Sequence, residues 1–407
     1  MKVLVINSGS SSIKFRLVDV VEESNGALTT GPALLQGSIK GIGSHTSFEV
    51  LGEHEDRSGA IEIRDHAQAL RVLFDRLAGS LGGIDAVGHR VVHGADRFVE
   101  STLITEEVEA GIDALSELAP LHNPACLAGI RGTREVLGSK LPMVAVFDTA
   151  FHKTMPAIAK QYAIPRELAD RHRISRYGFH GIAHASLAHG YAATTGTPLE
   201  RARLITLQLG NGCSVAAIAQ GRSVETSMGF TPLEGLVMGT RSGDVDASII
   251  SYLCEREKAE PAEVERWLNE RSGLLGLSGR SSDMRELLRA AEQEQDQRVM
   301  FAIDLFCYRV RKYLGAYLAV LGGADAIVFG GGIGENAPEI RDRICRNMGW
   351  CGLRLDPDRN RASVGLAPGQ AARISVEESR PSAYVVAADE ETWIARETVR
   401  CVRGGRS

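Results

Sequence analysis

Short apolar runs alternate with amphipathic stretches along this chain, a pattern typical of an α/β protein whose sheets are covered by helices. The first run, Val3–Ile6, predicts a buried strand. It ends in Asn7 and a tract of glycine and serine, and the apolar pattern resumes at Ile13–Phe15, so we expect a hairpin. Apolar residues at three- and four-residue steps predict helices over 67–81, 124–137, 261–271, 282–292, 298–321 and 391–402. Asn123 is the expected N-cap of the second helix.

A second hairpin of the same kind follows about two hundred residues later. A predicted strand over 204–209 leads into Gly210-Asn211-Gly212 and returns through Ser214 and Val215. Two further apolar strands, 143–148 and 326–329, follow the two hairpins in the same order. This repetition predicts a duplicated domain with a nucleotide held between the copies. The expected domains are 1–152, completed by a terminal helix in 388–407, and 153–387.

The composition is that of a globular protein with two cores: 407 residues, 44% hydrophobic and 24% charged. A net charge of −5 argues against a nucleic-acid binder. We expect no membrane span, because the longest apolar stretch, 314–334, contains several glycines and Asp325. We also expect no secretory leader, because the first strand begins at Val3. Seven scattered cysteines without a C-x-x-C pair indicate reduced thiols and a cytoplasmic location.

Two arginines stand in apolar surroundings. Arg90 lies inside the strand-like segment GHRVVHG, where it either pairs with a structural carboxylate or reaches into a cleft to bind a carboxylate or phosphate. Arg241 follows a long, glycine-rich and nearly uncharged loop. A solvent-facing role explains such an arginine poorly, so anion binding is the favoured interpretation there.

Most of the other candidate groups also have a purely structural interpretation. The serines and Lys14 of the first hairpin suit a phosphate, or form an ordinary turn. His180, between glycines, could donate to a ligand or simply pack. Asp148, at a strand end, could hold a metal ion or a metal-bound water. The acids 389–391 could do the same, or could merely favour the start of a helix.

Ten ordered motifs resemble the acetate kinase family, within the superfamily of acetate and sugar kinases, heat-shock chaperones and actin. They are NSGSSSIKF, GHRVVHG, LAPLHNP, VFDTAFH, RYGFHG, LGNG, TSMGFTPLEGLVMGTRSGD, SGRSSDMR, GGIGEN and DEETWIARET. The resemblance runs nearly end to end. It implies a two-domain, duplicated actin-like (ribonuclease H-like) α/β fold with a nucleotide cleft between the domains. It also implies a homodimer, with 153–387 as the domain that binds the nucleotide and dimerises.

The resemblance also implies roles for individual residues. Asn7 and Glu390 would bind Mg²⁺, with Mn²⁺ as an alternative metal. The residues implied to act on the reacting groups are Arg90, Arg241, Asp148, His180 and His122. Those implied at the nucleotide and its phosphates are Lys14, Ser10, Ser12, Gln208, Leu209, Gly210, Asn211, Gly212, Asp283, Met284, Arg285, Gly332, Ile333, Gly334, Glu335 and Asn336. The acid would lie against Arg90, Val92, Leu121, Phe179 and Pro232.

The implied activity is reversible, direct in-line transfer of a phosphoryl group from ATP to acetate, giving acetyl phosphate and ADP. A carboxylate is already a nucleophile, so the site must neutralise charge and align the reactants. A kinase for propionate or another short-chain carboxylate is the alternative within this class. An ATP-driven clamp of the actin and chaperone type is the alternative outside it. Such a clamp has no need of two arginines beside a small apolar pocket.

The sequence departs from the family pattern in three places. Gln208 stands where family members commonly carry histidine, so phosphate affinity or the choice of phosphoryl donor could differ. Ala387-Ala388 replaces a Pro-Thr pair, which is expected to loosen the loop before Glu390. Gly330-Gly331 replaces Thr-Ala, which is expected only to add backbone freedom.

Overall fold

The computed structural model describes residues 1–9, 12–24, 26–42, 46–52, 57–61, 63–77, 83–120 and 122–404. The chain divides into two compact units, one formed by Met1–Phe151 with Glu390–Ser407 and the other by His152–Asp389. Each unit contains one sheet with helices packed against it. The expected α/β class is therefore confirmed.

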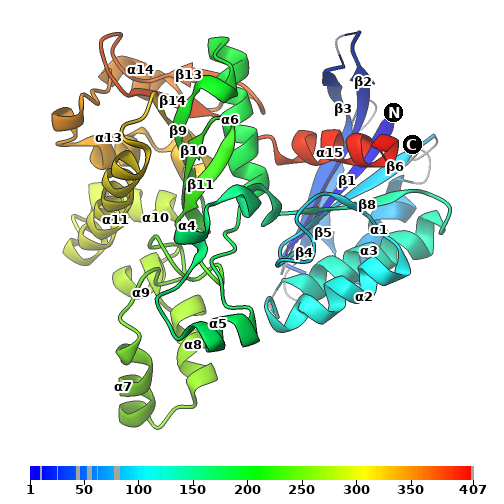
Figure 1. Ribbon diagram of the computed structural model, residues 1–407, viewed down its shortest axis with the longest axis horizontal. Coiled ribbons are helices and arrows are strands. Elements are labelled where there is room, and N and C mark those ends of the chain that lie inside the picture. Colours follow the sequence, from blue (N-terminus) through cyan, green and yellow to red (C-terminus); the bar gives the residue numbers. More distant parts are fainter. Residues whose placement is uncertain are drawn as a thin grey trace. The chain divides into compact units, whose positions relative to one another are not determined.

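The sheet of the first unit has the strand order β5-β4-β3-β2-β1-β6-β8-β7 (Figure 1). β1 pairs antiparallel with β2 and parallel with β6, and β6 pairs parallel with β8. The described elements are β1 (Lys2–Ser8), β2 (Ser12–Glu22), β3 (Leu28–Lys40), β4 (Thr46–Gly52), β5 (Arg57–Ile61), α1 (His66–Leu77), β6 (Ala86–Val91), β7 (Thr102–Leu103), α2 (Glu106–Ala114), α3 (Asn123–Leu137), β8 (Met143–Phe147) and α15 (Glu390–Gly404).

Helices cover both faces of this sheet. Leu4 and Val87 pack in a buried cluster with Leu73 of α1 on one face. Gly88, the next residue of β6, faces the other side, where a Cβ atom would lie 2.3 Å from Oγ1 of Thr398 in α15. Successive strand residues face opposite sides, so α15 covers the face opposite α1 (Figure 1).

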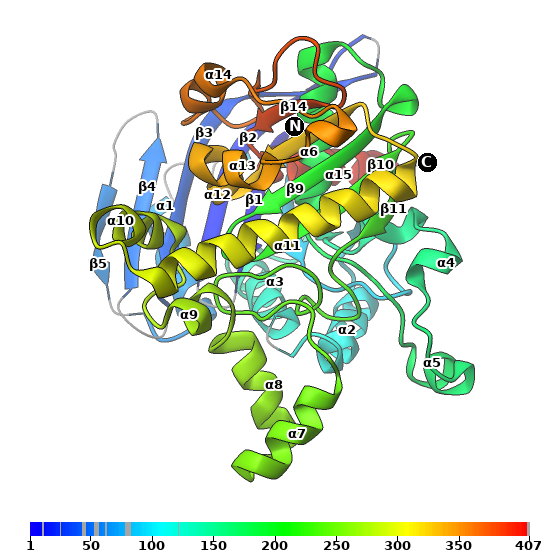
Figure 2. The same cartoon turned by 90° about the vertical axis from the view of Figure 1, so that its left-hand side faces the viewer.

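The sheet of the second unit has the order β11-β10-β9-β12-β14-β13. Helix α6 packs on β9, β12 and β14, and the long helix α11 packs on β9 and β10 (Figure 2). The described elements are α4 (Ala157–Lys160), α5 (Arg166–His172), α6 (Gly181–Thr195), β9 (Arg203–Leu209), β10 (Cys213–Ala219), β11 (Arg222–Thr226), α7 (Ser248–Glu257), α8 (Pro261–Glu270), α9 (Gly273–Ser278), α10 (Met284–Gln293), α11 (Gln297–Leu321), β12 (Ala326–Gly330), α12 (Gly331–Asn336), α13 (Pro338–Cys345), α14 (Pro357–Ala362), β13 (Ala371–Arg373) and β14 (Ser382–Val386).

The two sheets share a core topology. In each, a meander of three antiparallel strands is followed by two strands parallel to the first: β3-β2-β1-β6-β8 and β11-β10-β9-β12-β14. The expected equivalence of 143–148 with 326–329 is wrong by one strand. β12 lies beside β9 as β6 lies beside β1, so β8 corresponds to β14. Apolar content alone could not distinguish these strands, because all of them are buried.

The predicted helices are present, with one correction at a cap, and positions 78–81 of the first predicted helix lie outside the described residues. α3 begins at Asn123 itself, and its N-cap position is His122, which makes no side-chain capping bond. Asn123 is fully buried, and its amide bonds both the N–H and the carbonyl of His93 at 3.1 Å. A tertiary contact therefore uses the side chain that the local pattern assigns to the cap.

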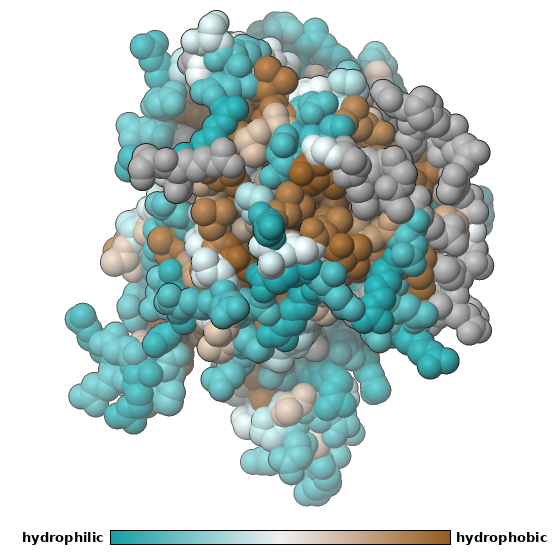
Figure 3. Space-filling view, turned by 90° about the vertical axis from the view of Figure 1, so that its right-hand side faces the viewer, coloured by the Kyte–Doolittle hydropathy of each residue, from teal (hydrophilic) through white to brown (hydrophobic). Residues whose placement is uncertain are grey.

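The described residues include no helix that is both long and apolar enough to cross a bilayer. One face shows apolar side chains gathered near its centre, with hydrophilic side chains around much of them (Figure 3).

Candidate active site

Three predicted site residues meet at the carboxyl edge of the first sheet. Asn7 is next to last in β1, Arg90 is next to last in β6, and Asp148 directly follows β8. The three strands are parallel neighbours, so their carboxyl ends lie at one edge of the sheet. The topology thus brings together residues as far as 141 positions apart in the sequence.

Arg90 is fixed by two of these neighbours. Its Nε lies 3.1 Å from both carboxylate oxygens of Asp148, and its Nη2 lies 2.5 Å from Oδ2. Its Nη1 donates to Oδ1 of Asn7 at 3.1 Å. Burial alone would lower the pKa of Arg90, but attraction and hydrogen bonding from Asp148 outweigh it and raise that pKa. The guanidinium is therefore permanently charged, paired with a carboxylate and set at a strand end.

Glu390, the first residue of α15, adds a carboxyl group with a raised pKa to these residues. Burial raises its pKa to about 7, against the opposing attraction of Arg90, and the charges of Glu391 and Asp148 add to the rise. A cation here would relieve that repulsion. The oxygen donors of Asn7 and Glu390 suit Mg²⁺, which proteins often hold through one or two carboxylates plus water and substrate phosphates. Among the described residues, no three His, Cys, Asp or Glu side chains converge on a metal position.

The first hairpin supplies a cation beside Asn7. Lys14 of β2 is exposed and lies directly opposite Asn7 in the antiparallel pair. The turn closes through a bond of 2.7 Å from the Gly9 N–H to the carbonyl of Ser12. Ser10, also predicted here, lies outside the described residues.

The predicted acid-binding residues of the first unit are only partly described. Leu121 lies outside the described residues. Val92 directly follows Val91, the last residue of β6, and is 6% exposed. His122 is half-buried at the N-cap position of α3.

In the second unit, His180 and Arg241 converge on Gly212. A Cβ atom at Gly212 would lie 3.2 Å from Nε2 of His180 and 3.6 Å from Nη1 of Arg241. His180 occupies the left-handed region, with φ of 58°, at the N-cap position of α6. Such backbone strain in a residue other than glycine is concentrated at functional sites. The distances at Gly212 show that the structure brings His180, Arg241 and Gly212 together, as the sequence predicted.

Arg241 is held by the loop that precedes it. Its Nη1 donates to the carbonyl of Pro232 at 3.2 Å and lies 3.7 Å from Sδ of Met238. The N–H of Gly239 bonds the carbonyl of Asn211 at 2.9 Å, which ties this loop to the 210–212 turn of the second hairpin. Phe179, beside His180, is almost fully buried.

An ion-pair network that the sequence analysis missed anchors the first half of the same loop. Arg176 Nη2 donates to Oε1 of Glu234 at 2.6 Å, and Nη1 reaches the carbonyls of residues 226–228. The hydroxyl of Tyr162 donates to Oε2 of Glu234 and accepts the N–H of Phe230 at 2.8 Å. The one sequence signal was Glu234 itself, a charge inside an otherwise uncharged loop.

Some of the residues expected at the nucleotide have buried side chains. Gln208 is the next-to-last residue of β9, and the turn after this strand closes through a bond of 3.1 Å from the Gly210 N–H to the Gly212 carbonyl. Leu209 and Met284 are buried, so only their backbones could contact a ligand.

Asp283 caps α10, accepting the N–H of Arg285 at 2.8 Å, and it forms an ion pair with the largely exposed Arg285 side chain. The Asp283 side chain therefore caps α10.

The GGIGEN segment corrects one expectation. It forms α12, in which Ile333 lies between Gly332 and Gly334, and Asn336 Nδ2 donates to the Gly332 carbonyl at 3.3 Å. Gly331 has φ of 74°, and a Cβ atom there would lie 2.6 Å from the Leu209 carbonyl oxygen. Glycine at position 331 is therefore required sterically, so the change does more than add backbone freedom.

The loop before Glu390 corrects a second expectation. The N–H groups of Ala387, Ala388 and Asp389 bond, in that order, the Gln370 carbonyl, the Glu335 carboxylate and the Ser186 hydroxyl, at 2.9, 3.1 and 2.9 Å. Glu335 also accepts the N–H of Gly331 at 2.9 Å. The alanine side chains take no part in these bonds, so their small size does not loosen the segment.

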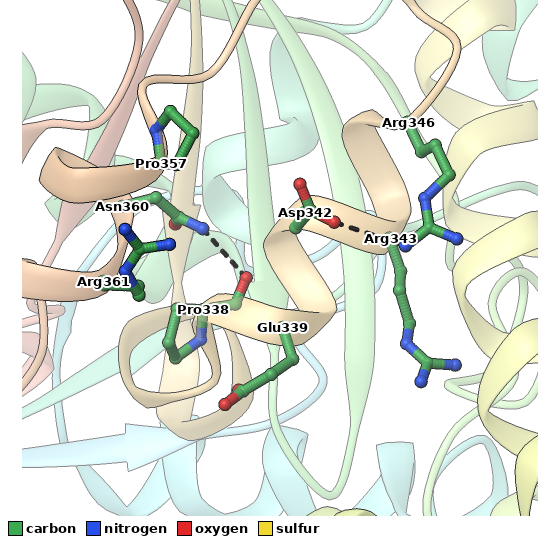
Figure 4. Close-up of a pocket in the computed structure, with 8 residues that line it drawn as sticks. All are labelled: Pro338, Glu339, Asp342, Arg343, Arg346, Pro357, Asn360 and Arg361. Atoms are coloured by element: carbon green, nitrogen blue, oxygen red, sulfur yellow. Dashed lines mark hydrogen bonds and ion pairs between the residues drawn. The ribbon is translucent and has the colours of Figure 1, made fainter.

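A surface pocket lies between α13 and α14 (Figure 4). It contains none of the predicted site residues. Its polar groups bond one another, as Asn360 Nδ2 does with the Pro338 carbonyl at 2.9 Å and Arg346 with Asp342 at 3.3 Å. Nothing in it marks a second reactive centre.

Comparison with known proteins shows which family the chain resembles over its length. The sequence profile of the acetokinase family matches residues 2–396. An acetate kinase of Solibacter usitatus is 48% identical over 418 aligned positions, covering 99% of both chains. The crystal structure of Porphyromonas gingivalis acetate kinase is 38% identical, with a TM-score of 0.87 over 98% of this chain and 99% of that one. A Francisella tularensis propionate kinase has the same identity and coverage, with a TM-score of 0.88.

Proposed function

The chain belongs to the acetokinase family, and we propose that it transfers the γ-phosphoryl group of ATP reversibly to acetate, giving acetyl phosphate and ADP. The match over 99% of both chains to an acetate kinase carries this proposal. The geometry supports it, because each unit presents one arginine among side chains suited to anions.

In the first unit, Arg90 would bind the acid and the transferring group. Asp148 holds the guanidinium plane through three contacts, so the edge of the plane that reaches Asn7 is set in advance. Preorganised charge of this kind stabilises a transition state without reorganisation at the moment of reaction. Val92, with Leu121, would contact the alkyl end of the acid.

In the second unit, Arg241 and His180 would stabilise the phosphoryl group in flight. Phosphoryl transfer passes through a loose, metaphosphate-like state whose charge is spread over three equatorial oxygens. Donors from Arg241, His180 and the 210–212 turn suit those oxygens. A carboxylate oxygen of acetate forms the new P–O bond, and the bond to the β–γ bridging oxygen breaks as ADP leaves.

We also propose that Asn7 and Glu390 hold Mg²⁺, with Mn²⁺ as an alternative. When bound, the ion supplies charge neutralisation at the β- and γ-phosphates. Glu390 must be ionised to serve as a ligand, and its raised pKa indicates that a cation would be needed to favour that form near neutral pH.

The direct test is a hydroxylamine trap for acyl phosphate with ATP, Mg²⁺ and a panel of C1 to C4 acids. We expect the highest kcat/KM with acetate. Acyl phosphate made faster from propionate would assign the chain to the propionate alternative. No acyl phosphate from any of the acids would overturn the kinase assignment.

The acid pocket gives a sharper prediction. Val92→Ala removes two methyl groups and should free room for about two methylenes, and apolar pockets discriminate by roughly 1–3 kcal/mol per methylene. The ratio of kcat/KM for butyrate over acetate should rise about tenfold or more, with Val136→Ala, an exposed valine of α3, as the matched control. An unchanged ratio in both Val92→Ala and Pro232→Ala would mean that the alkyl group binds elsewhere.

We further propose a cytoplasmic homodimer. The resemblance to the family supports the dimer, and two largely exposed aromatic residues of α11, Phe301 and Tyr308, are seven positions apart and lie on one side of that helix. The substrate ATP and seven free cysteines suit a reducing compartment. Light scattering of the purified chain tests the dimer, and a monomer at micromolar concentration would contradict it.

A further inference from the structure

A continuous chain of side-chain hydrogen bonds runs from the sheet of the second unit to His180. Oγ of Ser214 lies 2.9 Å from Nδ1 of His180 and 2.8 Å from Nε2 of His184. Nδ1 of His184 lies 2.8 Å from Oγ1 of Thr206. His184, Ser214 and Thr206 are each fully buried.

The fold places these four groups on one face of the sheet. Ser214 of β10 and Thr206 of β9 belong to a directly paired ladder, in which Ser214 lies opposite Gln208 and Thr206 opposite Ala216. Helix α6 packs on this face, and His180 and His184 are four residues apart on it, so both imidazoles reach the same hydroxyl.

The number of protons limits how these hydrogen bonds between Thr206, His184, Ser214 and His180 can be directed. A serine hydroxyl carries one proton, so it can donate to only one of the two imidazole nitrogens, and the other nitrogen must donate to it. If His184 donates through Nε2, the Ser214 hydroxyl donates to Nδ1 of His180. Neutral His180 then carries its own proton on Nε2. In the reverse arrangement, neutral His180 would present a lone pair at Nε2.

The surroundings favour the first arrangement. Nε2 of His180 and Nη1 of Arg241 lie within 3.2 and 3.6 Å of one point above Gly212, so a second positive charge on His180 would be repelled. For His180 to donate to an anion at that point beside Arg241 while its ring stays neutral, its proton must be on Nε2.

A neighbouring histidine shows the same arrangement. Nε2 of His152 lies 3.0 Å from the Phe179 carbonyl, which can only accept, so His152 carries its proton on Nε2. Its Nδ1 lies 2.8 Å from the hydroxyl of Ser223. A buried serine hydroxyl therefore pairs with an Nε2–H imidazole at His152, beside the hydrogen bonds of Ser214.

We infer that Ser214 and His184 are positioning residues that hold His180 as its neutral Nε2–H tautomer, ready to donate to the phosphoryl group. The inference rests on the proposed function for its catalytic consequence, but the tautomer itself is a property of the resting protein.

The test combines kinetics with ¹⁵N NMR of histidine-labelled full-length protein, with the His180 signals assigned by their loss in His180→Gln. We expect Nε2–H in the wild type and a mixture of tautomers in Ser214→Ala. The kcat of Ser214→Ala should fall about 10- to 100-fold, because a wrongly held imidazole costs at least this much in other enzymes, while KM for acetate changes less than about twofold. Ser214→Thr, which keeps the hydroxyl, should restore both readouts.

Ser223→Ala is the matched control, since it removes an equally buried serine–imidazole bond that does not involve Ser214, His184 or His180. It should leave kcat and the His180 signals as in the wild type. If Ser214→Ala does not fold, Ser214→Cys keeps the shape with a weakly bonding thiol and should give the same two changes. His180 remaining Nε2–H in the folded Ser214 variant, or kcat within twofold of wild type, would overturn the inference. A wild type that makes no acyl phosphate would instead defeat the proposed function, with the tautomer still readable.

Discussion

The structural pairing of Arg90 uses three of its five N–H donors. Its contacts with Asp148 occupy Nε and one terminal nitrogen, while the other terminal nitrogen reaches the amide of Asn7. The two interpretations that the sequence left open are therefore compatible. The carboxylate that pairs with Arg90 also fixes the direction in which its remaining donors point.

Replacing either arginine should nearly abolish turnover. We expect Arg90→Ala and Arg241→Ala each to lower kcat by about 10³-fold or more, the range found for other arginines that stabilise phosphoryl transfer. Arg71→Ala, which removes an exposed ion pair with Glu135, is the control and should leave kcat unchanged. A folded Arg90 or Arg241 variant that retains more than a tenth of wild-type kcat would remove that residue from the proposed mechanism.

Gln208 lies opposite Ser214, just before the 210–212 turn of the second hairpin, and its Oε1 has no hydrogen-bond partner within the described part of the chain. Gln208→His would replace a neutral amide with a ring that can be charged, and a charge-assisted bond is roughly twice as strong. We expect a lower KM for ATP or a higher kcat at slightly acid pH, with KM for acetate unchanged.

Steady-state kinetics of this variant and the wild type between pH 6 and 8 make the comparison. Pyrophosphate should be included as a competing donor. Faster turnover of the wild type with pyrophosphate than with ATP would mean that Gln208 marks a changed donor.

At the scale of the element, helix starts combine local stabilisation with the display of side chains. Asp283 caps α10 and Asp296 caps α11 by the same kind of bond to backbone N–H groups. Only Asp283 is among the residues that the family resemblance implies at the nucleotide, and it also orients Arg285.

The two caps therefore form a matched pair. Asp283→Ala and Asp296→Ala should each lower the free energy of unfolding by about 1 kcal/mol, the usual cost of a lost N-cap. Only Asp283→Ala should raise KM for ATP, by several-fold. Chemical denaturation and ATP kinetics measure the two effects. Equal KM values in both variants would limit Asp283 to capping.

At the scale of the whole molecule, the chain leaves the first unit after Phe151 and returns to it at Glu390. The returning helix α15 covers one face of the first sheet, and its first residue is the carboxyl group with the raised pKa. The stability of the protein should therefore depend on the protonation of Glu390.

The sign of this dependence follows from the raised pKa. Between the ordinary value of 4.5 and about 7, the folded state binds more protons at Glu390 than the unfolded state, so stability falls as pH rises through this window. Glu390→Gln should be more stable than the wild type at pH 8, by roughly 1–3 kcal/mol, and no more stable near pH 4.5. Denaturation without divalent metal tests this, with Glu135→Gln as the exposed control. A difference that is the same at both pH values would contradict it.

Local patterns in the sequence were sufficient to predict both hairpins and six helices (α1, α3, α8, α10, α11 and α15), whereas helices such as α2 and α6 were not predicted. Apolar periodicity and turn residues act over a few positions, so α3, α8 and α11 lie within a few residues of their predicted ranges. The motifs were also sufficient to indicate the family, because long ordered matches need no knowledge of contacts.

Tertiary structure decided what pairs with what. The Arg90–Asp148 contact, the use of Asn123 by His93, and the placing of β12 beside β9 all depend on neighbours far away in the sequence. The chain Thr206–His184–Ser214–His180 forms only when α6 lies on the face of β9 and β10. A side chain's periodicity reports which way it faces. Its hydrogen-bond partner is set by sheet order and helix packing, where burial penalises each polar group that remains unpaired.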